Sequence, residues 1–228
     1  MKTLLVSFCI TAAFFLQGMA QNPSAQNSQL YKHYQMKYVF GMKYNDGDVA
    51  KDALISMIAL DPSDDSLRLQ LCYYYFDNGQ YPSSLFVSAD MLGRNPDNLA
   101  ALRFNALSYQ QMGVRDRAIA SYESLYLKSS DLDALFQAAV LQYEAGRYSE
   151  SKTNADIIAK NPKARELTME FSAEDGDITV NMEAAAHNLK GMIEKAGGNI
   201  QEARKNFEQS LAAQPDFSLA KKNLEELQ

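Results

Sequence analysis

The chain has 228 residues, of which 46% are apolar and 22% are charged, and its formal net charge is −6. This mixture is typical of a globular protein with enough apolar material for a core. The acidic balance, without any run of basic residues, argues against binding to nucleic acid or to an anionic membrane surface, because both need clustered Lys and Arg.

The N-terminus has the pattern of a secretory signal peptide over residues 1–20. Lys2 precedes an apolar run from Leu4 to Leu16, and small residues stand at Gly18 and Ala20. The run is shorter than the roughly 20 residues of a membrane-spanning helix, so we expect cleavage after Ala20 and no transmembrane segment in the mature chain. The leader resembles those of Gram-negative, Bacteroidetes-like envelope proteins. This resemblance implies a periplasmic location, with association with the outer membrane as an alternative.

The mature chain would begin with a polar segment and keep a single cysteine. Residues 21–29 are rich in Ser, Asn and Gln without periodicity, which predicts a disordered lead-in. Cys72 would be the one cysteine left after cleavage, so it cannot form an internal disulfide. Its apolar neighbours predict a small core residue.

From residue 30 onward the sequence repeats with a period near 34 residues. Pro closes successive units, and Gly falls between the two apolar-periodic segments of a unit. These punctuating residues are Pro62, Pro96, Pro162 and Pro215, and Gly79, Gly113 and Gly146. Gly takes the left-handed backbone that ends a first helix, and Pro stops a second one. The pattern predicts helix pairs that must stack, because no pair can bury its apolar face alone.

This punctuation resembles that of the tetratricopeptide-repeat family. The most complete unit, Ala184 to Pro215, matches the family pattern at Leu189, Gly191, Gly198, Ala203, Phe207, Ser210 and Pro215. The resemblance implies an all-α fold, a right-handed α-α superhelix of about five helix pairs. The units would cover residues 31–64, 65–98, 99–131, 132–162 and 184–215, with a capping helix over 217–227. Residues 30–228 would form a single domain.

One segment, residues 163–183, breaks the period. Pro162 and Pro215 are 53 residues apart, well beyond one repeat. Within the excess, apolar and polar residues alternate on either side of Asp175-Gly176. Period-two alternation around an Asp-Gly turn predicts a β-hairpin near 166–182. An isolated hairpin is marginally stable, so its apolar side must lie on the solenoid or on a partner.

No residue pattern points to catalysis or metal binding. His33 and His187 have no ligand-like partner four residues further along the chain. The acidic clusters 45–48 and 174–177 lack the twelve-residue calcium pattern and are typical of turns. Motifs for nucleotide binding or an activated nucleophile are absent from the sequence. We therefore predict no catalytic, cofactor-binding or metal-binding residues, and a protein that is not an enzyme and needs no cofactor.

In the tetratricopeptide-repeat family the first helix of each unit lines a concave surface. Carried over to this sequence, the resemblance implies that this surface presents Leu69, Tyr73, Phe76, Arg103, Leu107, Gln110, Phe136, Val140, Tyr143, Asn188, Met192 and Lys195. Aromatic side chains, one Arg and amides suit a bound peptide. For Tyr73, Phe76 and Phe136 the alternative is packing between helices.

The expected function is a non-catalytic scaffold for protein–protein interaction in the cell envelope, with a peptide or protein partner in the concave groove. An alternative is a structural subunit of an envelope complex that forms a homo-oligomer through the hairpin edge or the first unit. A third reading, an enzyme or small-ligand carrier, would need a closed polar pocket with convergent ionisable groups. The stretch from Arg165 to Lys195 is where we expect features individual to this protein.

Overall fold

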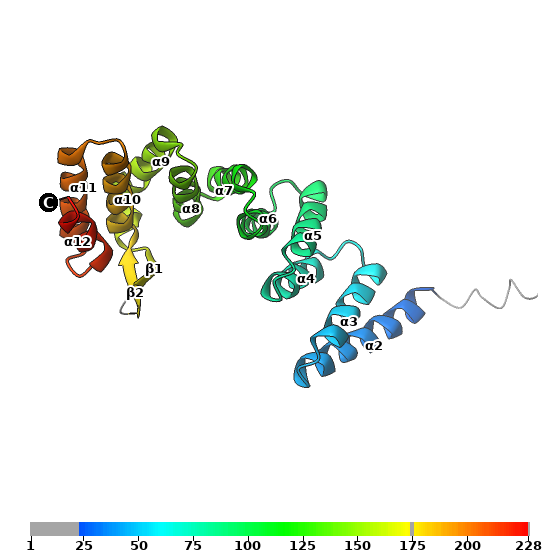
Figure 1. The fold of residues 1–228 in the computed structure, drawn as a ribbon. Helices are drawn as coiled ribbons and strands as arrows, with labels where there is room; N and C mark the ends of the chain where they lie inside the picture. Colours follow the sequence, from blue (N-terminus) through cyan, green and yellow to red (C-terminus); the bar gives the residue numbers. More distant parts are fainter. Residues whose placement is uncertain (1–22, 174–175, 228) are drawn as a thin grey trace, which may run out of the picture. The chain divides into compact units, whose positions relative to one another are not determined.

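The computed structural model describes residues 23–173 and 176–227, in which α-helices follow one another and two strands interrupt them once (Figure 1). The helices are α2 (Pro23–Lys43), α3 (Gly47–Leu60), α4 (Asp65–Asp77), α5 (Tyr81–Arg94), α6 (Leu99–Gln111), α7 (Arg115–Ser129), α8 (Leu132–Glu144), α9 (Tyr148–Lys160), α10 (Met182–Ala196), α11 (Ile200–Ala213) and α12 (Ser218–Glu225). The short 3-10 helix η1 (Pro162–Arg165) and the strands β1 (Thr168–Ala173) and β2 (Gly176–Asn181) lie between α9 and α10. The predicted all-α solenoid with a hairpin insertion is confirmed.

The chain divides into two compact units, one ending at Asn78 and one beginning at Gly79. In the first unit α2 packs on α3, and α3 packs on α4. In the second unit each helix from α5 to α11 packs on the helix that follows it. Consecutive packing of this kind is the arrangement of a repeat solenoid. The repeat region that we expected as one domain, residues 30–228, spans both units.

Asp and Asn side chains start the first helix of several repeats. The side chains of Asp64, Asn98 and Asp131 accept hydrogen bonds from backbone N–H groups in the first turns of α4, α6 and α8. Asn181 does the same for α10, with 2.9 Å between its Oδ1 and the nitrogen of Ala184. These caps satisfy N–H groups that have no partner within the helix, so each repeat begins at a defined residue.

The turn between the two helices of a repeat needs a left-handed residue. Gly79, Gly113, Gly146 and Gly198 supply it, with φ between 69° and 77°. In the first repeat Asn45 takes this role with φ of 56°. Asn tolerates the left-handed region better than most side chains, so a repeat without the expected Gly still forms its turn.

The structure differs from the predicted lead-in and says nothing of the leader. Helix α2 begins at Pro23, so residues 23–29 are helical where we expected disorder over 21–29. Pro is compatible with the first turn of a helix, and Ala and Gln are good helix formers, so the helix extends outward from its packed part. The signal peptide predicted for residues 1–20 lies outside the described residues. No described helix is both long enough and apolar enough to span a membrane.

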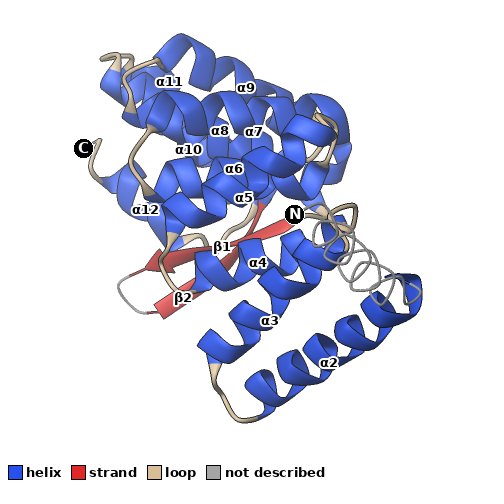
Figure 2. Cartoon of the chain, turned by 90° about the vertical axis from the view of Figure 1, so that its right-hand side faces the viewer, coloured by secondary structure: helices blue, strands red, loops and turns tan. Residues whose placement is uncertain are grey.

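The hairpin packs one face onto the second unit. Its strands are antiparallel, with Met169 opposite Val180 and Phe171 opposite Ile178. Val180 is fully buried, and the other three side chains pack against a core cluster of the last two repeats. Figure 2 shows the two strands (red) side by side below α10 and α12. The hairpin is therefore held by the solenoid, as the marginal stability of an isolated hairpin requires.

Candidate protein-interaction site

Helices α2 and α4 line a cleft in the first unit. Tyr38 and Met42 lie one turn apart on α2, and α4 contributes Gln70, Tyr73, Tyr74 and Asp77. These α4 positions are three or four residues apart, which places them on one side of the helix. Ala50 and Leu54 of α3 also line the cleft and are almost fully buried. The cavity measures about 220 Å³.

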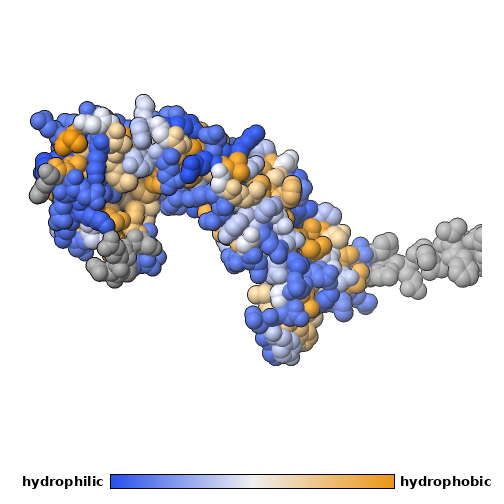
Figure 3. Space-filling view, viewed as in Figure 1, coloured by the Kyte–Doolittle hydropathy of each residue, from blue (hydrophilic) through white to orange (hydrophobic). Residues whose placement is uncertain are grey.

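The cleft is apolar inside and polar at its rim. Met42 is 58% exposed and Tyr73 is 53% exposed, so large apolar groups stand open beside it. Asp77 and Asn78 supply polar groups at the C-terminal end of α4. In the view of Figure 3, apolar atoms (orange and tan) interrupt the polar surface over α2 and α3. Such a combination of an apolar pocket and a few polar groups suits an apolar side chain of a partner.

Tyr74 is held in place by the start of α3. The Lys51 ammonium lies 5.5 Å from the centre of the Tyr74 ring, and the Tyr74 hydroxyl lies 3.5 Å from Asp48 Oδ1. Lys51 also donates to Asp48 at 2.7 Å; this hydrogen bond lowers the pKa of Asp48 and raises the pKa of Lys51. A Cβ at Gly47 would stand 3.0 Å from the Tyr74 ring. One wall of the cleft is thus formed before any partner arrives.

Close approach of α2 and α3 sets the depth of the cleft. A Cβ added at Gly41 would stand 2.7 Å from the backbone nitrogen of Ala50. Gly41 is buried, and its neighbour Met42 is among the most exposed large apolar residues of the described chain. The absence of a side chain at Gly41 therefore lets the helices meet while Met42 stays at the cleft.

Two predicted groove residues of the second unit are interior. Phe136 of α8 is 4% exposed, and Phe171 of the hairpin packs edge-on against its ring. Asn188 of α10 is 6% exposed and accepts a hydrogen bond of 2.9 Å from Asn223 of α12. This placement corrects the expectation that both side chains face a partner. Segments inserted or added outside the repeat pattern cover them, and a repeat-by-repeat comparison carries no information on such segments.

The side chains of the predicted α6 residues contact neighbouring helices. Arg103 forms ion pairs with Asp131 and Asp133 at the start of α8. Gln110 accepts a 2.6 Å hydrogen bond from the hydroxyl of Tyr122, a buried residue of α7 whose pKa is raised by burial. Leu107 is half-buried against the core of this repeat. These side chains serve the junctions between helices, and only their outer parts remain accessible.

The remaining predicted residues of the second unit are half-buried. Val140 and Tyr143 pack against the same cluster as the hairpin. Met192 accepts a weak hydrogen bond from Asn188, at 3.7 Å to sulfur. Lys195 forms an ion pair of 2.7 Å with Glu226, just after α12. Capping helix and hairpin thus both contact positions that the family resemblance assigns to the groove.

In the first unit Tyr73 lies at the cleft, whereas Leu69 and Phe76 are half-buried and do not line it. The cleft residues Tyr38, Met42, Gln70 and Tyr74 were not among the predicted site residues. For Tyr38 and Met42 the usable signal was their spacing of four residues, which places two large apolar side chains on one side of α2.

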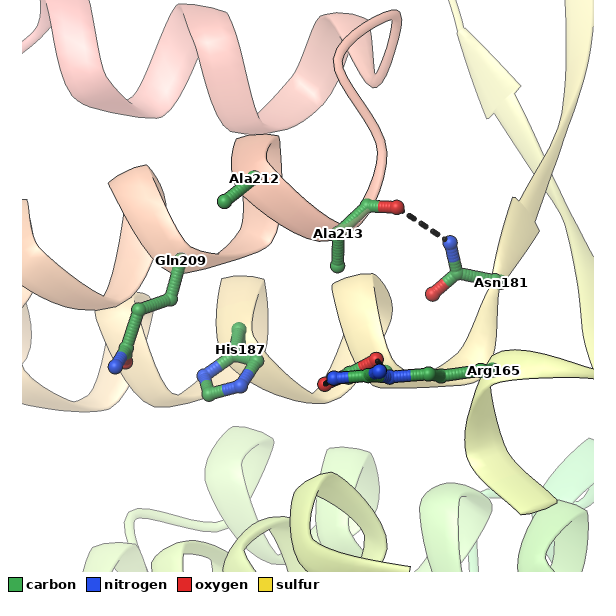
Figure 4. Close-up of a pocket in the computed structure, with 7 residues that line it drawn as sticks. Arg165, Asn181, His187, Gln209, Ala212 and Ala213 are labelled. Carbon is green, nitrogen blue, oxygen red and sulfur yellow. Dashed lines mark hydrogen bonds and ion pairs between the residues drawn. The ribbon is translucent and has the colours of Figure 1, made fainter. Parts of the chain in front are cut away.

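A second, polar cavity of about 490 Å³ lies at the base of the hairpin (Figure 4). Arg165 donates to both carboxylate oxygens of Glu183, at 2.6 and 3.1 Å. Nδ1 of His187 is buried without a hydrogen-bond partner among the described residues. Burial, followed by the charge of Lys190, lowers the pKa of His187. The neutral imidazole and the closed ion pair present no nucleophile with an adjacent base. Within the described ranges no three His, Cys, Asp or Glu residues are grouped to hold a metal ion.

Solved structures with a similar fold are tetratricopeptide-repeat proteins. A tetratricopeptide repeat protein from Parabacteroides merdae ATCC 43184 has a TM-score of 0.64 at 17% identity, over 87% of this chain and 72% of that one. The MamA protein has a TM-score of 0.65 at 15% identity, over 82% of this chain and 93% of that one. YrrB, a repeat protein with an unusual peptide-binding site, has a TM-score of 0.62 at 14% identity, over 81% and 87% of the two chains.

No family model and no curated protein matches the sequence. Identities of this size carry information on the fold and none on the partner. The helix pairs, the left-handed turn residues and the structural similarity lead to one conclusion: this chain has the tetratricopeptide-repeat fold.

Proposed function

We propose that the protein is a non-catalytic interaction scaffold of the cell envelope, and that it binds a peptide segment of a protein partner through the cleft of the first unit. The observation that carries this proposal is the exposure of Met42 and Tyr73 beside a cleft that is lined by the buried Leu54. An apolar side chain of the partner would enter the cleft and release water from these surfaces. Asp77 and Asn78 would bind polar groups of the peptide at the rim.

Two further observations support a peptide rather than a small molecule. A second hollow of about 360 Å³ adjoins the cleft, since Met42, Tyr74 and Asn78 line both. A chain of several residues fills a run of shallow hollows better than a compact ligand does. The fold of YrrB, a protein with a peptide-binding site, is similar to that of this chain. The envelope location rests on the leader sequence.

Photo-crosslinking tests the proposal. A photoreactive amino acid placed at Met42 should capture a defined partner in an extract of the source organism's envelope. The matched control is the same amino acid at Phe86 of α5, which is 76% exposed and lies in the other unit. Sequencing of the crosslinked peptide should identify one segment from Met42 and not from Phe86. Equal capture from both positions would contradict the proposal.

A second candidate function is self-association, which a different surface of α2 favours. Phe40 and Tyr44 are 44% and 69% exposed, and their rings stack with centroids 6.1 Å apart. At 100° per residue they lie on the opposite side of α2 from Met42. Sedimentation of the mature chain distinguishes the two: a concentration-dependent dimer that Tyr44→Lys abolishes would favour self-association, and a monomer would favour the scaffold.

A further inference from the structure

The two outer edges of the hairpin differ in their hydrogen bonds to the rest of the chain. Along β2, the side-chain amide of Gln214 replaces a neighbouring strand. Its Nε2 donates to the carbonyl oxygen of Thr179 at 2.8 Å, and its Oε1 accepts from the N–H of Asn181 at 2.7 Å. Asn181 also donates from its own side chain to the carbonyl oxygen of Ala213 at 3.0 Å. The outer edge of β2 is therefore closed between Thr179 and Asn181.

The outer edge of β1 is open. The N–H of Met182 donates to the carbonyl oxygen of Leu167 at 2.8 Å, which fixes the alternation of bonded and non-bonded pairs along the ladder. By this alternation the backbone groups of Thr168 and Glu170 point outward, away from β2. The hydrogen bonds found among the described residues give these outward groups no partner, and both residues are exposed. An edge of this kind is a template for another strand.

The open edge faces the side of α8. Phe171 of β1 packs on Phe136 of α8, whereas the closed edge of β2 lies at the end of α11. Figure 1 shows β1 on the α8 side of the hairpin and β2 on the α12 side. A strand added to β1 would direct alternate side chains to the same face as Met169 and Phe171, which pack against the core cluster of the second unit. That position favours apolar side chains.

The acidic residues of the hairpin indicate which side chains the added strand should carry on its other face. The two strands contain Glu170 and Asp177 and no basic residue. A Lys or Arg beside Glu170 would form a favourable cross-strand pair. Two copies of β1 paired antiparallel about Glu170 would bring the two Glu170 carboxylates together, which is unfavourable. The edge thus fits a basic partner strand better than a second copy of this chain.

We propose that the free edge of β1 binds an extended peptide with alternating apolar and basic residues, as a third strand of the hairpin. Backbone hydrogen bonds to Thr168 and Glu170 give the affinity, and the alternation sets the register. This surface does not depend on the cleft of the first unit, so the two sites are tested separately.

The test uses an acetylated and amidated heptapeptide of alternating lysine and valine, titrated into the mature chain and followed by NMR. Binding should protect the N–H of Glu170 from exchange with solvent. Thr168→Pro removes an outward N–H from the open edge and should weaken binding about tenfold or more. Thr179→Pro makes the same change on the closed edge and should leave affinity within about twofold.

Further controls keep the outcome decisive. The resonances of Val180 would show whether Thr168→Pro disturbs the hairpin. In that case the wild-type chain is titrated instead with peptides that are N-methylated at alternate residues. One of the two N-methylation registers should lose binding. Tyr73→Ala should leave the affinity for this peptide unchanged. The proposal would be overturned if the peptide protected amides outside β1 instead, or if both N-methylated peptides bound equally. It would also be overturned if the chain formed a dimer through β1 and did not bind the peptide.

Discussion

Phe171 of the hairpin stands edge-on to Phe136 of α8, with ring centroids 6.2 Å apart and an interplanar angle of 83°. The same ring lies 5.5 Å from Phe217, which directly precedes α12. Three segments that are distant in sequence thus meet over a position that the repeat pattern assigns to a groove. In the second unit the hairpin covers this part of the surface, so a partner cannot contact Phe136 there.

Replacement of Phe171 by Ala should destabilise the protein. The ring loses two aromatic contacts and leaves a gap over Phe136, so we expect the free energy of unfolding to fall by about 2–3 kcal/mol, less than for a fully buried Phe. Urea unfolding measures the change. Thr179→Ala, on the solvent face of the same hairpin, should stay within about 0.5 kcal/mol of the wild type. Equal effects of the two substitutions would show that the hairpin does not support the solenoid.

Gly191→Ala should also destabilise the protein, because α10 and α11 meet there. A Cβ at Gly191 would stand 2.3 Å from the ring of Phe207, which is fully buried. Overpacking of this kind costs about 1–3 kcal/mol. Gly93 of α5 is the matched control, since a Cβ there meets nothing within 4 Å. Gly93→Ala should raise stability by about 0.5–1 kcal/mol in thermal or urea unfolding, and a loss at this position would contradict the packing argument.

His187 should make stability depend on pH below its ordinary pKa of 6.5. Burial, followed by the charge of Lys190, lowers the pKa of His187 in the folded protein, although the charges of Glu183 and Asp156 and a hydrogen bond with Asn206 partly oppose this. The unfolded chain therefore binds a proton first, and stability that is present above pH 6.5 is lost as the pH falls toward the lowered value.

Urea unfolding at pH 7.5 and at pH 5.5 measures this dependence. The loss of stability between the two pH values should be smaller in His187→Gln than in the wild type. His33→Gln should keep the wild-type loss. The same pH dependence in His187→Gln would show that another group is responsible.

The repeats and the hairpin could be predicted because their signals are local. Gly at positions such as Gly113 and Gly146 reports a left-handed turn by its identity, and Pro marks the end of a helix pair. Alternation of polar and apolar residues around Asp175-Gly176 is equally readable in a short window. Each of these features follows from the backbone preferences of a few neighbouring residues.

The candidate site was less predictable, because it depends on contacts between distant residues. Asn45 stands where the other repeats have Gly, and the positions that the family resemblance implies for the concave surface include no residue of α2, so Tyr38 and Met42 were not selected. Phe136 packs against Phe171, which lies thirty-five residues further along the chain, and no periodicity in α8 or in β1 indicates that contact. Tyr73, one of the predicted partner-binding residues, lies at the cleft, and its use in binding remains a prediction.

The central claim is that the cleft beside Met42 and Tyr73 holds the partner. The most direct measurement is calorimetric titration of the crosslinked partner segment, prepared as a synthetic peptide, into the wild type and into Tyr73→Ala and Met42→Ala. We predict that each substitution weakens the affinity about tenfold or more, with helicity and melting temperature unchanged, and that Phe86→Ala has no effect. Unchanged affinity in both cleft variants, or a loss that follows a fall in melting temperature, would contradict the account.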